Sequence, residues 1–154
     1  MQTAFPGIHA MQNLHPLFVH FPIALWVAAL LFELVALLRS SEEWHRSAAR
    51  LLYLGTLLGF AAAATGWIAQ KSVPPAGAAH DLMELHQTLM LFAVSAAGWL
   101  SILAYLRPRL SSAQRKWFLA GLIVLVLLTV FGSDRGAELV YRYATSVSLP
   151  SGPK

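Results

Sequence analysis

Four apolar segments, each about as long as a membrane-spanning helix, dominate this sequence of 154 residues. They cover about 17–38, 47–69, 85–106 and 116–139. A helix needs roughly 20 apolar residues to cross the hydrocarbon core of a bilayer. The purely apolar part of the fourth segment stops at Phe131, so we expect this helix to continue through Gly136. The sequence predicts an all-α fold, a four-helix bundle forming one integral membrane domain over residues 1–154, and no internal repeat stands out.

The composition agrees with a lipid environment. Hydrophobic residues make up 57% of the chain and charged residues 12%, whereas soluble domains have about 45–50% and about 25%. The absence of Cys excludes disulfides, thiolate metal sites, iron–sulfur clusters and covalent c-type haem. The basic residues flank the apolar segments, so they indicate membrane topology and not a nucleic-acid site.

The distribution of basic residues predicts the orientation. Seven lie between the first and second or the third and fourth segments, or in the first turn of the segment that follows: Arg39, Arg46, Arg50, Arg107, Arg109, Arg115 and Lys116. Only Lys71, Arg135, Arg142 and Lys154 belong to the other side. The positive-inside rule then places both termini on the outer side of the membrane. The first dozen residues lack a basic region, so we expect the first segment to remain as a span and not to act as a cleaved signal peptide.

Five of the six histidines fall on the expected outer side: His9, His15, His20, His80 and His86. His20 lies one turn into the first segment and His86 in the first turn of the third, so we expect the two imidazoles at similar depth. Two helices that each supply one imidazole can bind haem iron from both faces or share a metal ion. The alternative is a hydrogen bond across a helix interface without any cofactor.

The remaining histidines receive weaker assignments. His15 lies beside Pro16 near the headgroups, where it either caps the helix or supports the site. His80 precedes Asp81, which could orient its imidazole toward a metal, unless the pair is a solvated loop. We expect His9 and His45 to be surface residues.

Small residues follow one stripe of the second segment: Gly55, Gly59, Ala62 and Gly66. They either make room for a porphyrin or let two helices pack closely, as small-xxx-small patterns do. We expect Trp26 either to stack beside the porphyrin ring or to pack in the core.

Two acidic residues of the spans need partners. Glu33 can pair with Arg50 or extend to the interface, and Asp134 can pair with Arg135 or help to hold a haem propionate or a water. The sequence offers no Ser-His-Asp arrangement, phosphate-binding loop or pair of carboxylates. It therefore gives no support for a hydrolase or a kinase.

The run His15-Pro-Leu-Phe-Val-His-Phe-Pro-Ile-Ala-Leu25 resembles the N-terminal signature of the DUF2231 family (domain of unknown function 2231), predicted bacterial four-helix membrane proteins. An Ala/Gly-rich second segment that ends near Thr65-Gly-Trp67, a third segment that opens on His86 and a Leu139-Val-Tyr141 close extend the similarity over most of the chain.

The chain differs from the family pattern at one histidine, and the domains fused to relatives suggest a functional setting. The family close usually ends in Tyr-x-His-Gly, whereas Tyr143 stands at the position of that histidine here. If relatives use the histidine as a ligand, this chain uses a different pair or has lost the site. Relatives occur fused to cytochrome c-like or Rieske-type domains, which implies a setting in membrane electron transfer.

The leading hypothesis is therefore an electron-transfer protein or subunit with b-type haem, rather than a stand-alone enzyme. His20 and His86 would be the axial ligands, supported by His15 and His80. The partners would be the lipid bilayer, a cytochrome c, a Rieske-type or other redox subunit, and quinone. One alternative is a non-catalytic accessory subunit of a respiratory or photosynthetic complex without a cofactor. Another is a copper or zinc protein that binds its metal through histidines.

Overall fold

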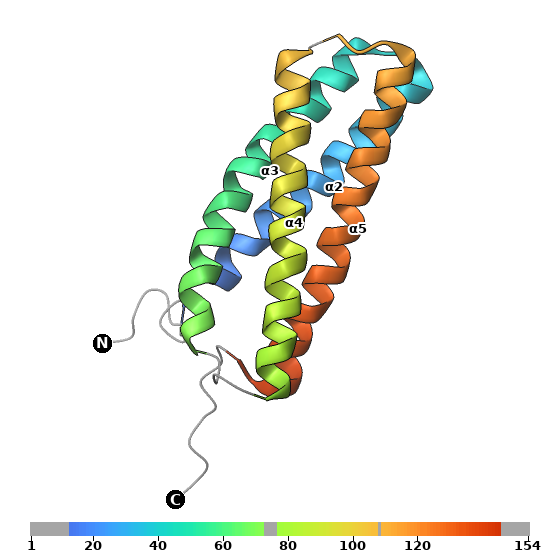
Figure 1. Ribbon diagram of the computed structural model, residues 1–154. Helices are drawn as coiled ribbons and strands as arrows, with labels where there is room; N and C mark the ends of the chain where they lie inside the picture. The colour runs from blue at the N-terminus through green and yellow to red at the C-terminus, as the bar shows by residue number, and fades with distance from the viewer. Residues whose placement is uncertain (1–12, 73–76, 108, 146–154) are drawn as a thin grey trace, which may run out of the picture.

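The computed structural model describes residues 13–72, 77–107 and 109–145, and they form four long helices (Figure 1). These are α2 (His15–Arg39), α3 (Glu42–Ala69), α4 (Ala78–Leu106) and α5 (Ser112–Tyr143), and the short 3-10 helix η1 (Gln70–Ser72) follows α3. The described ranges contain no strand. Each long helix is long and apolar enough to cross a membrane. The expected all-α bundle of four membrane-spanning helices is confirmed.

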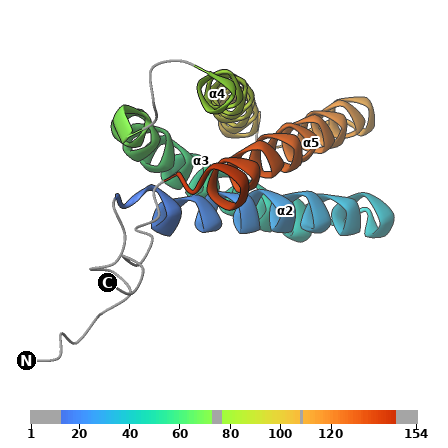
Figure 2. The same ribbon diagram turned by 90° about the horizontal axis from the view of Figure 1, so that it is seen from below.

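Each helix packs against two neighbours. The pairs in contact are α2 with α3, α3 with α4, α4 with α5, and α5 with α2, so α2 and α4 occupy opposite corners of the bundle (Figure 2). The most extensive contacts lie within the two hairpins, α2–α3 and α4–α5. We call the end where α2 and α4 begin the histidine end, and the end where α3 and α5 begin the arginine end.

Two helices begin earlier than the apolar segments predict. Glu42 and Glu43 open α3, and Asp81 lies in the first turn of α4. Carboxylates stabilise the positive N-terminal end of a helix dipole, so these polar turns continue the helices beyond the lipid-facing segments. As a result His45 lies inside α3, and His86 lies eight residues after the first residue of α4.

The centre of the first hairpin is the indole of Trp26, which is fully buried. A Cβ atom added at Gly55 would lie 2.8 Å from Cδ1 of Trp26, and one at Gly59 would lie 2.8 Å from Cζ2. The indole therefore occupies the space above both glycines. At these two positions close helix packing is confirmed, and the room expected for a porphyrin is filled by a side chain.

The two hairpins bury equivalent positions. When 70 is added to the residue numbers of α3, most of its buried positions coincide with buried positions of α5. When 71 is added to those of α2, three of its buried positions coincide with buried positions of α4. The α3–α5 pairs are His45 and Arg115, Ala48 and Phe118, Leu52 and Leu122, Gly55 and Leu125, Gly59 and Thr129, and Ala62 and Gly132. The α2–α4 pairs are Pro22 and Ala93, Trp26 and Ala97, and Glu33 and Ala104. We call this correspondence of buried positions between the two hairpins the hairpin repeat.

Side-chain volume is exchanged between the halves of this repeat. The first hairpin sets Trp26 against two glycines, whereas the equivalent positions of the second are Ala97 with Leu125 and Thr129. A core is sensitive to volume and tolerant of how neighbouring residues share it. Both hairpins therefore fill their interiors, although the residues at equivalent positions differ.

This complementarity is testable by a double-mutant cycle in detergent. Trp26→Ala should cost about 3–5 kcal/mol of unfolding free energy because it leaves a large cavity, and Gly55→Leu about 1–3 kcal/mol because it overpacks the hairpin. Together they recreate the Ala97 and Leu125 pair of the second hairpin, so the double variant should lose less than the sum of the two. Gly98→Ala is the control, since its Cβ would meet only Cζ of Phe60 at 4.0 Å. Additive losses would contradict the account.

Candidate functional site

Two histidines from opposite corners of the bundle meet at its histidine end. The ring centroids of His15, the first residue of α2, and His86 of α4 lie 6.3 Å apart, with their planes at 77°. Both rings are partly buried. Because His86 lies eight residues into α4 and His15 is the first residue of α2, α4 extends beyond the level at which α2 begins.

Each imidazole is held by a backbone carbonyl of the neighbouring helix. Nδ1–H of His15 donates to the Ala62 carbonyl at 3.0 Å, and Nδ1–H of His86 donates to the Gly132 carbonyl at 2.7 Å. A carbonyl only accepts, so these bonds place the ring hydrogen of each neutral imidazole on Nδ1. Thr65 Oγ1 lies a further 3.4 Å from Nδ1 of His15.

Each ring also rests on a glycine four residues after that carbonyl. A Cβ atom at Gly66 would lie 2.9 Å from Cε1 of His15, and one at Gly136 would lie 2.9 Å from Cε1 of His86. The carbonyls and glycines of α3 and α5 are related by the same shift of 70 residues that relates the buried positions of these helices. The two histidines are therefore equivalent half-sites of the hairpin repeat.

The Nε2 atoms of this pair are the chemically available groups. Within the part of the chain that the structure describes, neither Nε2 accepts a hydrogen bond. A neutral imidazole whose Nδ1–H is held by a carbonyl presents the lone pair of Nε2, and this is the arrangement found in histidine metal ligands. The described ranges contain no group of three or more His, Asp or Glu side chains placed to hold a metal ion.

The structure corrects the expected pairing of His20 with His86. His20 is exposed, and its Nδ1–H donates to the Pro16 carbonyl of its own helix at 2.8 Å. It lies five residues further along α2 than His15, on a different side of the helix. Helical periodicity explains this, since five residues carry a side chain well past one full turn. His15, expected only as outer support, is the residue that faces His86.

The other sequence-predicted residues lie apart from this pair. His80 is in the first turn of α4, and its Nε2 lies 3.3 Å from Oε1 of Glu84 rather than beside Asp81. Tyr143 is exposed at the last residue of α5. His9 lies outside the described residues.

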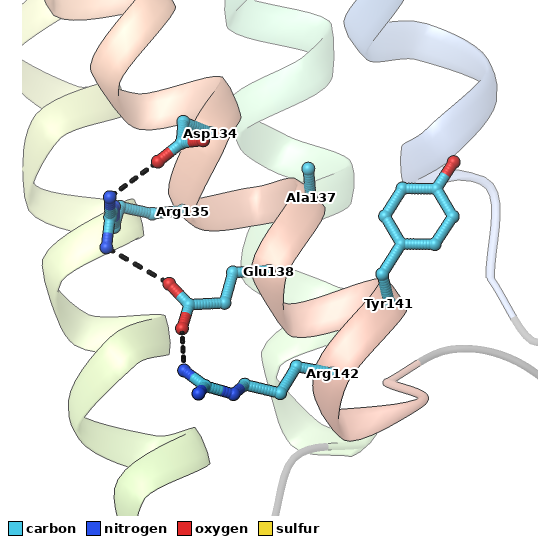
Figure 3. Close-up of a pocket in the computed structure, with 6 residues that line it drawn as sticks. All are labelled: Asp134, Arg135, Ala137, Glu138, Tyr141 and Arg142. Atoms are coloured by element: carbon cyan, nitrogen blue, oxygen red, sulfur yellow. Dashed lines mark hydrogen bonds and ion pairs between the residues drawn. The ribbon is translucent and has the colours of Figure 1, made fainter.

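Near the histidine end, α5 carries an open groove of about 570 Å³ lined by paired charges (Figure 3). Arg135 pairs with Asp134 and, at 3.0 Å, with Glu138, while Arg142 pairs with Glu138 at 2.6 Å. The expected ion pair of Asp134 with Arg135 is confirmed. The two arginines and the two carboxylates pair with one another, so these ion pairs stabilise the end of α5.

A second polar layer lies at the arginine end, and all its central groups are buried. Nδ1 of His45 lies 2.6 Å from Oε2 of Glu33, and Nε of Arg115 lies 4.0 Å from Oε1 of the same carboxylate. Arg115 also donates to Glu42 through Nη2. The exposed fractions of Glu33, His45 and Arg115 are 0%, 1% and 7%. One carboxylate of α2 is thus shared by the equivalent residues of the two hairpins, His45 and Arg115.

Sequence reasoning missed this layer. His45 was expected on the surface and Glu33 beside Arg50, but His45 is buried against Phe118 with ring centroids 5.5 Å apart, and Arg50 is exposed. The signal was available in the helical spacing. From His45 the apolar stripe continues through Ala48, Leu52 and Gly55, which places the histidine on the buried face.

The fold and its polar layers define a class, the polytopic α-helical membrane proteins, in which polar side chains are buried between helices. Residues 11–149 match the model of the family described as "Predicted membrane protein (DUF2231)", and the chain belongs to this family. The resemblance seen in the sequence is thereby confirmed. No curated protein and no solved structure matches the chain.

The layer at the arginine end predicts a large effect of Glu33→Gln. Removing one partner of a buried ion pair leaves the other charge uncompensated and typically costs about 3–5 kcal/mol. The thermal midpoint of the purified variant should fall accordingly. Glu43→Gln is the matched control, since it removes the same charge from an exposed position of α3. Equal midpoints for the two variants would contradict the assignment.

Proposed function

We propose that this protein binds b-type haem through Nε2 of His15 and Nε2 of His86 and carries electrons in the membrane. The separation of the two rings supports this most directly. Two imidazoles bound to opposite sides of one ion by bonds of about 2.0–2.1 Å would have ring centroids roughly 6 Å apart. The observed value is 6.3 Å.

The number of protein ligands favours haem over a bare metal ion. Zinc in structural sites takes four protein ligands and in catalytic sites three, yet no third His, Asp or Glu joins this pair among the described residues. Haem brings four equatorial nitrogens of its own, so two axial imidazoles complete its coordination. The zinc alternative would need donors that the described site does not offer.

The surrounding residues have defined tasks in this proposal. The carbonyls of Ala62 and Gly132 fix the tautomer of the imidazoles and raise the basicity of Nε2. Gly66 and Gly136 let the rings lie close to α3 and α5. When bound, haem supplies one-electron chemistry. With both axial positions taken by histidine no position stays open, so electron transfer is favoured over oxygen binding.

The setting is proposed from the sequence. The excess of Arg and Lys at the arginine end favours this end as cytoplasmic, so the histidine pair would lie toward the periplasm of a bacterial inner membrane. A cytochrome c or a Rieske-type subunit is the partner that the family resemblance implies, and quinone is a further partner that the haem hypothesis suggests. Because the ligand pair is His15 and His86, Tyr143 does not remove a ligand.

The proposal predicts a reducible Soret band for protein purified from haem-replete cells. His15→Ala and His86→Ala should each abolish most of the bound haem, whereas His20→Ala and His80→Ala should retain it. Absorbance spectra before and after dithionite, with metal analysis, provide the measurement. A colourless protein with stoichiometric partner subunits would support the accessory-subunit alternative instead, and a colourless protein with bound copper or zinc the metal-ion alternative.

The glycine beneath His86 gives a second prediction. Gly136→Val should displace the ring, because even a Cβ atom there would lie 2.9 Å from Cε1, and haem occupancy should fall several-fold. Gly98→Val is the control, since its Cβ meets only Phe60 at 4.0 Å. Helix content by circular dichroism should be the same in both. Unchanged haem occupancy in Gly136→Val would argue against His86 as a ligand.

A further inference from the structure

The arginine end carries an open cleft of about 890 Å³ that the haem proposal does not use. It is lined by Glu42, Arg46, Leu106, Arg107 and Arg109. Arg46 belongs to the second turn of α3, whereas Leu106 ends α4 and the other two arginines follow it in the connection to α5. Three guanidinium groups from two separate segments therefore border one space.

These three arginines have no carboxylate partner in the part of the chain that the structure describes. The arginines of α5 differ, since Arg115, Arg135 and Arg142 all form ion pairs. The one acidic residue of the cleft, Glu42, is already engaged by Arg115. The cleft thus presents an uncompensated positive charge, which suits an anion.

The surroundings of the cleft place it at the depth of lipid headgroups. Leu106 in its wall is 70% exposed, and the nearby aromatic residues Tyr105 and Trp117 are 77% and 78% exposed. Exposed Trp and Tyr at the ends of membrane helices mark the boundary between headgroups and acyl chains. A ligand here would meet cationic groups on one side and an apolar, lipid-facing helix end on the other.

We propose that this cleft binds the phosphate headgroup of an anionic phospholipid. Arg binds phosphate oxygens through paired N–H donors, and Leu106 would contact the start of an acyl chain. Basic pockets between membrane helices on the cytoplasmic side are recognised sites for such headgroups. A soluble phosphate would gain nothing from the apolar wall, so the lipid is the better occupant. This inference is independent of haem binding.

The test compares two triple variants with the same loss of charge. R46Q/R107Q/R109Q removes the arginines of the cleft, whereas R39Q/R50Q/K116Q removes three exposed basic residues of the same end that do not line it. Native mass spectrometry after exchange into micelles with cardiolipin, phosphatidylglycerol or phosphatidylcholine measures the retained lipid. The cleft variant should bind the two anionic lipids at least about tenfold more weakly than the wild type, because it loses the paired N–H donors that would hold the phosphate oxygens.

The control variant and the competing ligands test whether the cleft is the lipid site. The control variant should lose less than about threefold, and phosphatidylcholine should be retained poorly by all proteins. Equal losses in both triple variants would overturn the cleft as a site. Displacement of cardiolipin by millimolar inorganic phosphate would show a site for free anions and overturn the lipid assignment. If the triple variant fails to fold, Arg107→Gln against Arg39→Gln provides the same comparison, with an expected loss of several-fold.

Discussion

The structure depends on one constraint: a polar group inside a membrane must find its partner within the protein. Both polar layers meet it with contacts between helices. At the histidine end two imidazoles donate to carbonyls of the adjacent helices, and at the arginine end one buried carboxylate faces His45 and Arg115. The contacts at the arginine end still leave Oε1 of Glu33, Nε2 of His45 and Nε of Arg115 without a hydrogen-bond partner among the described residues. At the histidine end two imidazoles from opposite corners each leave Nε2 unused, and this pair of like donors makes that layer the candidate for a ligand.

The hairpin repeat explains why the site has this form. Each hairpin carries one histidine on its first helix, a carbonyl acceptor on its second helix and a glycine four residues further on. Two equivalent hairpins packed side by side then bring two equivalent imidazoles together. The same repeat places His45 and Arg115 around Glu33 at the opposite end, where the second hairpin has Ala104 in place of a second carboxylate.

The fold was predictable because it follows from long apolar segments, whereas the site depended on helix ends and on helix rotation. The sequence indicated four spans and a histidine cluster, but the relative depth and rotation of α2 and α4, which bring His15 and not His20 to His86, could not be read from it. The repeat was hidden because Trp26 and Gly55 on one side correspond to Ala97 and Leu125 on the other. His45 was misjudged because the polar first turn of α3 obscured the buried stripe that starts there.

The central claim is that two equivalent imidazoles, one from each hairpin, coordinate a single haem iron. Electron paramagnetic resonance of the oxidised, purified protein tests it most directly, since the spin state of ferric haem reports its axial ligands. The account predicts a low-spin ferric signal, which two histidine ligands would give to the iron. A high-spin axial signal, or the absence of a haem iron signal in protein from haem-replete cells, would contradict it.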